Sequence, residues 1–411
     1  MTAHLLSVGT ELLLGEIINT NQAYLSSRMA EMGFSVFYHT TIGDNLPRLV
    51  KGIKEALKDA DILMITGGLG PTQDDLTKES VAEALGEKLI LFPEALKTIE
   101  SFFQKIGRSM PPMNQKQAYF PEGVRILKNP AGTAPGCFIE KNSKKIFLLP
   151  GPPREMKKMF EEEVYPIIKK EQEFVIHSKI LKVFGLGESK MAEEVSDLID
   201  HSLNPTVAPY AKDFESHLRI TAKASSIEEA LKLIQPTEEE IKNRLGINIY
   251  GTDKDSLETV TAKILVEKKL SISTAESCTG GLVASKLIDF PGISAVFKNG
   301  FITYSNESKI KLLGVKEETI QKYGAVSCET VSEMAYKTAL ISGSDISIAV
   351  SGIAGPGGGS EEKPVGLVYL GLSFFGKIKV KELRLWGDRN HIRNRAALCA
   401  LDWLRRELFD L

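Results

Sequence analysis

Apolar residues at the start of the chain form short runs separated by segments with helical spacing. The runs Ala3–Val8, Phe34–Tyr38 and Asp61–Thr66 predict strands. Between them, apolar positions recur on one helix face, which predicts a helix over 21–32, with Asn19 or Thr20 as its cap, and a helix over 46–58. This alternation favours a parallel sheet covered by helices on both faces. In such sheets, ligands bind at the carboxyl ends of the strands.

The pattern changes twice farther along the chain. Charged residues accumulate near 160–175 and polar residues fill Gly251–Asp255, so both segments are expected to be domain boundaries. Between them the pattern predicts a small α+β unit with alternating strands and helices over 174–184, 188–200, 216–224, 227–244 and 247–250. We therefore expect three domains, over residues 1–170, 171–252 and 253–411.

The last part of the chain predicts a second α/β domain with its own core. It begins with a helix over 256–268 and a strand at Leu270–Ala275. The remaining elements expected are a strand near 295–304, helices at 307–313 and 328–342, a strand at 345–351, two hairpin strands within 365–384 and a final helix at 390–408.

Composition excludes several classes of protein. The net charge of the 411 residues is -2, so the chain has no global attraction for nucleic acid or an anionic membrane. The four cysteines form no C-x-x-C pair and the six histidines are scattered, which disfavours a disulfide framework and a zinc site. No segment matches a signal peptide or a membrane span, so we expect a cytoplasmic protein.

Polar clusters follow three predicted strands of the first domain. The loop Gly67–Gly70 can bring backbone amides close to a phosphate, and Asp74 and Asp75 beside it suggest a divalent cation. One of these aspartates could instead cap a helix over 76–85. Glu11 and Asp44 follow the other two strands, and Asp44 is also a candidate cap for the helix over 46–58.

A second cluster lies in the last domain. Ser277 stands where a strand meets a helix, a position that can expose a hydroxyl beside backbone amides. Since no histidine lies in a catalytic motif, Lys309 is the better candidate for the base, provided that burial lowers its pKa. The alternatives are that Ser277 only caps a helix over 281–289 and that Lys309 is a solvated surface residue. Cys278 is a rival nucleophile.

Two further segments of this domain suit phosphate recognition. Ser351–Ser360 is a glycine-rich loop that follows a strand, although such a loop can also be a flexible hairpin connection. Arg389 and Arg393 lie one turn apart at the start of the final helix. Two arginines at a helix N-terminus indicate a bound anion, with a solvated arginine pair as the alternative.

Several motifs resemble the competence/damage-inducible protein (CinA) family over the full length. In the first domain they are Gly9–Glu11, Thr66–Thr72, Asp75–Thr77, Asn129–Gly136 and Leu149–Met156. The resemblance implies a molybdopterin-binding-type fold with metal-dependent ADP-ribose pyrophosphatase activity. It implies Asp44 and Asp75 as ligands of a divalent metal ion of the Mg, Mn or Co class, with Asp74 and Glu11 as further catalytic candidates. The implied substrate-binding residues are Gly67, Gly68, Gly70, Thr72, Asn19, Asn129, Thr133, Pro150 and Gly151.

The last domain is similar to the family's C-terminal domain and to nicotinamide mononucleotide deamidases. The matching segments include Thr274–Gly281, Gly300–Lys309, Ser351–Gly366 and Gly387–Arg389. The resemblance implies metal-free hydrolysis of nicotinamide mononucleotide to nicotinate mononucleotide and ammonia, with Ser277 attacking and Lys309 taking its proton with help from Tyr304. The implied substrate-binding residues are Thr279, Gly280, Gly352, Gly355, Arg389 and Arg393.

The middle domain resembles the KH-like module of the family. Its segment Gly185–Glu188 lacks the G-x-x-G spacing that clamps a nucleic-acid backbone, so nucleic-acid binding is not expected. The resemblance implies a homodimer. The alternative for the whole chain is a molybdopterin- or nucleotide-binding protein that acts in competence or the DNA-damage response without the first activity.

Overall fold

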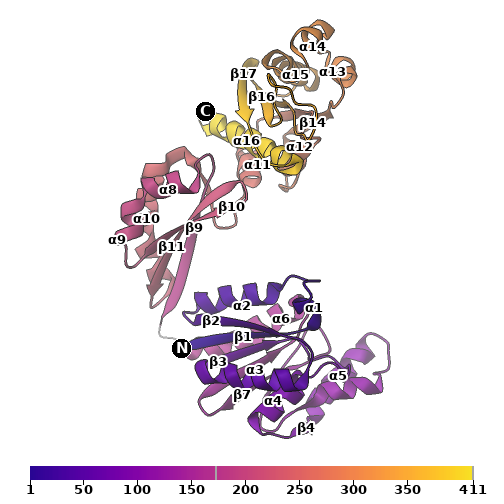
Figure 1. The fold of residues 1–411 in the computed structure, drawn as a ribbon, viewed down its shortest axis with the longest axis vertical. Coiled ribbons are helices and arrows are strands. Elements are labelled where there is room, and N and C mark those ends of the chain that lie inside the picture. Colours follow the sequence, from indigo (N-terminus) through magenta and orange to yellow (C-terminus); the bar gives the residue numbers. More distant parts are fainter. Residues whose placement is uncertain (172–173, 410–411) are drawn as a thin grey trace. The chain divides into compact units, whose positions relative to one another are not determined.

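The computed structural model describes residues 1–171 and 174–409, which divide into two compact units (Figure 1). The first unit is Met1–Ser178 with Thr221–Ile234, and the second is Lys179–Ile220 with Gln235–Leu411. Residues of the middle region therefore belong to both units. No helix in the described ranges is long and apolar enough to cross a bilayer.

The N-terminal sheet has the strand order β2-β1-β3-β8-β7-β6, and its first four strands are parallel. Its strands are β1 (Thr2–Val8), β2 (Ser35–Ile42), β3 (Ile62–Thr66), β6 (Arg125–Leu127), β7 (Gly136–Lys141) and β8 (Lys144–Leu149), and a separate pair consists of β4 (Leu89–Leu91) and β5 (Tyr119–Pro121). The helical elements are α1 (Thr10–Leu13), α2 (Thr20–Glu31), α3 (Leu46–Asp59), α4 (Thr77–Leu85), α5 (Pro93–Lys105), η1 (Pro112–Ala118), α6 (Pro153–Met159), η2 (Phe160–Val164), α7 (Tyr165–Ile168) and η3 (Lys169–Glu171).

Alternate residues of the buried strands face opposite layers of helices. Leu6 and Leu63 pack in the cluster that holds the apolar faces of α3, α4 and α5. Leu5 and Met64 pack in the cluster with α2, α6 and η2. The predicted doubly wound arrangement is therefore confirmed, because the inner parallel strands β1, β3 and β8 are buried on both faces.

Two predictions on helix ends had different outcomes. Asn19 caps α2, as one of the two expected caps, and its Oδ1 accepts from Gln22 N. The prediction that Asp44 caps the next helix is wrong, because Asn45 is the N-cap of α3 and accepts from Arg48 N. The Asp44 carboxylate instead bonds to Thr10.

The middle region forms a sheet with the order β10-β11-β9-β12. Its elements are β9 (Val175–Val183), α8 (Glu188–Glu194), α9 (Ser196–His201), β10 (Thr206–Lys212), β11 (Glu215–Ala224), α10 (Ile227–Leu245), η4 (Gly246–Asn248) and β12 (Ile249–Thr252). The helix predicted over 188–200 is two helices, because the backbone at Val195 leaves helical values. Strand β10 was not predicted from the sequence.

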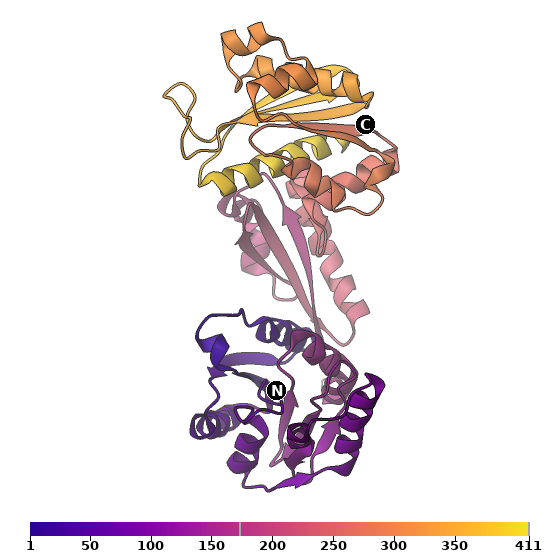
Figure 2. The ribbon, with the colours of Figure 1, turned by 90° about the vertical axis from the view of Figure 1, so that its right-hand side faces the viewer.

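The C-terminal sheet has the order β14-β13-β15-β16-β17, with three parallel strands followed by an antiparallel hairpin. Its elements are α11 (Leu257–Lys268), β13 (Ile272–Glu276), α12 (Leu282–Ile288), η5 (Ile293–Ala295), β14 (Phe297–Ile302), α13 (Asn306–Leu313), α14 (Glu317–Tyr323), α15 (Cys328–Ser342), β15 (Ile346–Gly352), β16 (Leu367–Phe374), β17 (Lys377–Arg384) and α16 (Arg389–Phe409). One face packs on α11, α12 and α16, and the other on α13–α15 (Figure 2).

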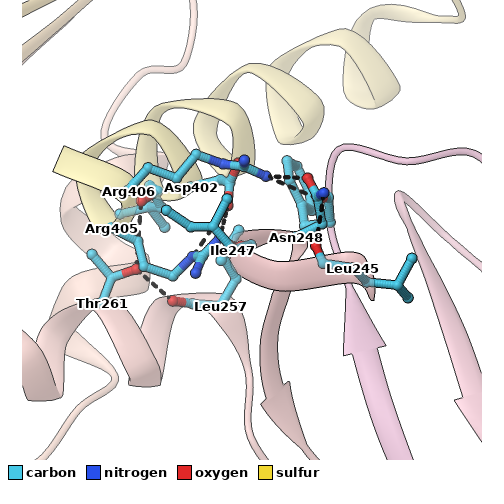
Figure 3. Close-up of polar contacts among 10 residues, drawn as sticks. Leu245, Ile247, Asn248, Leu257, Thr261, Asp402, Arg405 and Arg406 are labelled. Carbon is cyan, nitrogen blue, oxygen red and sulfur yellow. Dashed lines mark hydrogen bonds and ion pairs between the residues drawn. The ribbon is translucent and has the colours of Figure 1, made fainter. Parts of the chain in front are cut away.

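Helix α16 is tied to the end of the middle region by a buried ionic network (Figure 3). Arg405 is fully buried and donates to Asp402 Oδ1 at 2.7 Å and to Ile247 O at 2.6 Å. Arg406 donates to Asp402 Oδ2 at 2.7 Å and to Asn248 Oδ1 at 3.1 Å. A charge buried this deeply is stable only with such partners, so the network fixes η4 against α16.

Candidate active sites

Ser277 and Lys309 form a hydrogen-bonded pair at the carboxyl end of β13. Ser277 follows the last residue of the strand, and Lys309 lies on the first turns of α13. Lys309 Nζ is 3.1 Å from Ser277 Oγ, and the two side chains are 32 positions apart in sequence. The structure therefore brings together a hydroxyl and an amine that the sequence had only suggested as partners.

The amine of Lys309 is removed from solvent. Its side chain is 1% exposed, so the alternative of a solvated surface lysine is wrong. Its Nζ also donates to the backbone carbonyls of Thr303, at 2.8 Å, and Tyr304, at 3.3 Å. Burial lowers the pKa of Lys309 to about 8, since the charged form loses its hydration. A substantial fraction of the amine is then neutral near physiological pH.

Glu276 caps the helix that follows Ser277. Its carboxylate is 1% exposed and accepts from the backbone amides of Gly281, Val283 and Ala284 at 2.9–3.0 Å. The alternative that Ser277 is the cap is therefore wrong, and the Ser277 hydroxyl is left for Lys309. Glu276 was not among the expected site residues, although a glutamate that ends a buried strand shortly before a helix is a usable signal for such a cap.

A cavity of about 260 Å³ opens over the pair. It brings together six of the predicted site residues, namely Ser277, Tyr304, Lys309, Gly352, Gly355 and Arg389. The glycine-rich loop after β15 forms one wall, and Gly352 leaves no room for a side chain because its Cα faces Val368 and the carbonyl of Leu367. The cavity has the dimensions of a small-molecule subsite.

Tyr304 and Arg389 lie at the rim of this cavity. Tyr304 is 62% exposed, and its hydroxyl accepts from Arg389 Nη2 at 3.0 Å. Arg389 Nη1 donates to Gly355 O at 2.6 Å. Tyr304 contacts Lys309 through its backbone carbonyl, whereas its ring hydroxyl is bonded to the arginine. The geometry thus places Arg389 where it can meet an anion that enters the cavity.

Arg393, Thr279 and Gly280 shape the turn instead of lining the cavity. Arg393 Nε donates to Cys278 O and its Nη2 to Thr279 O, both at 3.0 Å. Gly280 has a positive φ of 61°, which suits a residue without a Cβ. Cys278 does line the cavity, but burial raises the pKa of its thiol to about 11. A neutral thiol is a poor nucleophile, which favours Ser277.

The predicted phosphate loops of the N-terminal region share one edge of the sheet. Strands β1, β2, β3 and β8 are parallel neighbours, so the segments after Val8, Ile42, Thr66 and Leu149 all leave the same edge. Gly151 packs against the backbone of Gly67, which joins two of these segments. The edge therefore contains Glu11, Asp44, Gly67–Thr72, Pro150 and Gly151.

Each of the two predicted metal ligands is bonded to a threonine, Asp44 to one on a neighbouring segment and Asp75 to one in its own loop. Asp44 Oδ2 accepts from the amide and hydroxyl of Thr10 at 3.0 and 2.8 Å. Asp75 Oδ2 accepts from the amide and hydroxyl of Thr72 at 2.9 and 2.5 Å. Asp74 and Glu11 are exposed. Helix α4 has no side-chain cap, so the alternative in which Asp74 or Asp75 caps it is wrong.

Gly67 and Gly68 have positive φ values of 96° and 64° and pass close to β1. A Cβ on Gly67 would meet the carbonyl of Val8, and one on Gly68 would meet Thr77. Thr77 in turn donates to Gly67 O at 2.7 Å. Packing alone thus requires glycine at both positions. Position 70 also favours glycine, because a Cβ on Gly70 would meet the Asp75 carboxylate.

Lys116 holds the aspartate loop in place, although no motif of the sequence indicates it. Its Nζ donates to the carbonyls of Thr72, at 2.8 Å, and Asp75, at 2.6 Å. It lies on η1, more than 40 positions away from Thr72 in sequence, so only the tertiary structure shows the contact.

Asn129 and Thr133 line a separate cavity of about 520 Å³ between α5 and the loop before β7. Asn129 donates to Glu155 Oε2 at 2.6 Å and to Ala134 O at 2.9 Å, which fixes the loop against α6. Lys97, Lys105 and Lys128 also line this cavity. Asn19 donates to Ser7 Oγ at 2.9 Å, so its amide is used within the fold.

No group of three or more histidine, cysteine or acidic side chains is arranged to hold a metal ion within residues 1–171 and 174–409. Carboxylate oxygens nevertheless suit a hard cation such as Mg²⁺, which binds one or two carboxylates together with water and substrate phosphates. Asp44 and Asp75 each keep one carboxylate oxygen outside the hydrogen bonds to Thr10 and Thr72. The donor chemistry at this edge therefore fits such an ion.

Comparison with known proteins decides the family. A model described as "Probable molybdopterin binding domain" matches residues 4–170, a CinA KH domain model matches 178–251 and a CinA C-terminal domain model matches 254–408. A competence-damage inducible protein of Clostridium novyi is 55% identical over 408 residues, which are 99% of both chains. The chain belongs to the CinA family. A Clostridium acetobutylicum relative of the same description is 54% identical over 411 residues, all of both chains.

Solved structures of CinA proteins match part of the chain. A CinA superfamily protein from Klebsiella pneumoniae is 35% identical and covers 38% of this chain and 97% of its own, with a TM-score of 0.37. An Agrobacterium tumefaciens competence/damage-inducible protein is 41% identical and covers 38% of this chain and 97% of its own, with a TM-score of 0.36. The expected family is thus confirmed, as is the fold class with a molybdopterin-binding-like, a KH-like and a CinA C-terminal domain, whereas the expected domain bounds stay a prediction.

Proposed function

We propose that this CinA protein is a hydrolase with two sites that act on pyridine-nucleotide breakdown products. The C-terminal site would deamidate nicotinamide mononucleotide, and the N-terminal site would cleave ADP-ribose to AMP and ribose 5-phosphate. The observation that carries the proposal is the contact of 3.1 Å between Ser277 Oγ and the buried Lys309 Nζ. A serine needs a base within hydrogen-bond reach to become a nucleophile, and a lysine serves when its pKa is lowered.

The surroundings of Lys309 orient its lone pair. In the neutral amine, the two N–H groups donate to Thr303 O and Tyr304 O. The lone pair of the nitrogen then points toward Ser277 Oγ. The amine takes the hydroxyl proton as Oγ bonds to the carboxamide carbon. The C–N bond then breaks, and the leaving ammonia carries away that proton from Lys309. Water hydrolyses the resulting ester, which releases nicotinate mononucleotide and restores the serine.

Binding groups for this substrate surround the pair. Backbone amides in the turn after Ser277 are the candidates to stabilise the oxyanion, since that turn leads into α12. Arg389, at the rim, would bind the 5′-phosphate. Arg393 is bonded to Cys278 O and Thr279 O, so we assign it to the shape of the turn and not to the phosphate.

The N-terminal reaction would depend on a divalent cation held by Asp44 and Asp75. When bound, the cation would neutralise charge on the diphosphate. Amides of the loop Gly67–Gly70 would hold the phosphate oxygens, and Asp74 or Glu11 would position the attacking water. Lys116 would keep the loop in this conformation through its bonds to Thr72 O and Asp75 O.

The proposal is tested by incubating the purified full chain with each substrate. We expect ammonia and nicotinate mononucleotide from nicotinamide mononucleotide without added metal, and AMP from ADP-ribose with Mg²⁺, Mn²⁺ or Co²⁺. Chromatography and an ammonia assay measure the products. If no ammonia forms, the deamidase is contradicted. If no AMP forms with any of these metals, the N-terminal region binds a nucleotide or molybdopterin without cleaving ADP-ribose.

A further inference from the structure

A second cavity in the C-terminal unit has no part in the proposed reactions. It has a volume of about 490 Å³ and lies between the loop Gly185–Gly187, the tip of the β10–β11 hairpin and the start of α16. We call it the hairpin cavity. Ser216 Oγ donates to Leu186 O at 3.1 Å, so the hairpin and the loop are joined at its base. The network around Asp402 separately fixes the middle region to α16 (Figure 3).

Three rings contact one another in series along one wall of the hairpin cavity. The His391 ring lies 4.9 Å from Trp386, stacked at 29°, and 4.7 Å from Phe214, tilted at 46°. Trp386 is 78% exposed, which is unusual for so large an apolar ring. It thus offers aromatic surface to a ligand while His391 supports it from within.

The hairpin tip is strained in a way that places the Phe214 ring against His391. Phe214 has a positive φ of 71°, a conformation that costs free energy for a bulky residue. Its backbone carbonyl accepts from Arg395, whose guanidinium lies over the Phe184 ring at 4.7 Å. A strained backbone conformation persists only where neighbouring contacts stabilise it. Here those contacts keep the Phe214 ring at the wall of the hairpin cavity.

The charges around the hairpin cavity favour an anion. Lys212, Arg384 and Arg395 line it together with two acidic residues, Asp213 and Glu215. Glu215 is already bonded to Tyr250 and His217. The Arg384 side chain is 71% exposed and its Nε is 3.0 Å from Glu382 Oε1, a surface pair that an incoming phosphate can compete with.

We propose that the hairpin cavity binds a single free nucleotide, with its base stacked on Trp386 and its phosphate contacting Lys212 and Arg384. Stacking tolerates any base, whereas paired cations select phosphate. The volume suits one small molecule, and a chain with a net charge of -2 offers little attraction for a long nucleic-acid strand. The inference does not depend on the proposed hydrolase activities.

The two tryptophans allow a direct test. Trp403 is 9% exposed and bonded to Glu407, so a Trp403→Phe variant of the full chain leaves Trp386 as the only tryptophan. Guanosine monophosphate is the probe, because it is neither substrate nor product of the proposed reactions. We expect saturable quenching of Trp386 fluorescence, and about tenfold weaker binding after Arg384→Gln, since a charge-assisted hydrogen bond is lost.

Controls separate this site from others. Arg125→Gln removes a similarly exposed arginine of the N-terminal unit, and Arg389→Gln removes the cation of the deamidase cavity, so neither should change the quenching. Guanosine should bind more weakly than its monophosphate. The proposal is overturned if no quenching occurs, if guanosine binds equally well, if Arg384→Gln has no effect, or if a single-stranded oligonucleotide binds far more tightly than the mononucleotide.

Discussion

The two candidate active sites share a position in the fold but differ in how complete they are. Both lie where parallel strands end and glycine-rich turns begin. In the C-terminal site the reacting groups, Ser277 and Lys309, are buried and bonded to each other. In the N-terminal site, Asp44 is bonded to Thr10 of a neighbouring segment and Asp75 to Thr72 of its own loop. The C-terminal site is therefore preorganised by the protein alone, whereas the N-terminal reaction, as proposed, would need a cation and substrate to bring its groups together.

The largest expected effect is on the preorganised site. Ser277→Ala removes the nucleophile and should lower the rate of ammonia release by about 10³-fold or more, whereas ADP-ribose cleavage should stay unchanged. Parallel ammonia and AMP assays on one preparation measure both. Ammonia release that persists in the variant would point to Cys278 instead, and a double variant would then identify it.

The reverse change is expected from Asp75→Ala. Loss of a metal ligand should lower AMP formation from ADP-ribose by about 10²-fold or more, with ammonia release unchanged. The Thr72→Val variant is the matched control, since it removes the hydroxyl bonded to Asp75 but keeps the carboxylate. If both activities fall in Asp75→Ala, the two regions do not act independently.

The pH dependence should also differ between the sites. Lys309 acts as a base only when neutral, and its pKa is lowered to about 8 by burial. Ammonia release, measured as kcat/KM, should therefore rise about tenfold per unit of pH below 8 and level off above it. A deamidase profile that is flat between about pH 6 and pH 9 would exclude Lys309 as the base.

The two arginines at the start of α16 should have distinct effects. Arg389→Gln should raise KM for nicotinamide mononucleotide about tenfold with little change in kcat, because it loses a contact to phosphate. Arg393→Gln should instead lower kcat, since Arg393 bonds to the carbonyls of the turn that carries the nucleophile. Steady-state kinetics of both variants measure kcat and KM. Identical effects would contradict the assignment of Arg389 to phosphate binding and of Arg393 to the turn.

The smallest effect concerns stability. Glu276→Gln replaces a buried carboxylate that accepts from three amides, and should lower the free energy of unfolding by about 1–3 kcal/mol. Urea denaturation of both proteins measures it. Glu267→Gln, on the exposed face of α11, should change stability by less than about 0.5 kcal/mol. Equal stabilities of the two variants would show that Glu276 is not the cap that the geometry indicates.

Periodicity predicted many elements of the fold, but none of those from β4 (Leu89–Leu91) to α6 (Pro153–Met159). Long apolar runs such as Ile62–Thr66 are buried on both faces, so they could be recognised as strands without tertiary information. Strand β10 and helix α14 were overlooked because short half-buried elements have weak periodicity. The choice of Asn45 over Asp44 as the cap of α3 depends on Thr10, which bonds Asp44 from another segment.

Candidate residues were easier to find than their roles. The segment around Ser277 indicated a nucleophile, but the burial of Lys309 results from packing of α13 and could not be inferred from its neighbours in sequence. Likewise, Gly67 and Gly68 suggested a phosphate loop, whereas the structure shows that contacts with Val8 and Thr77 already require glycine there. Lys116 could be found only from the structure, since its partners are distant in sequence.

The most direct measurement follows AMP formation and ammonia release by the full chain, incubated with each substrate in the presence and absence of a chelator such as EDTA. A cation-dependent N-terminal site predicts that AMP formation stops, and a self-contained Ser277–Lys309 pair predicts that ammonia release continues at the same rate. Loss of ammonia release on chelation, or AMP formation that survives it, would contradict the distinction between the two sites.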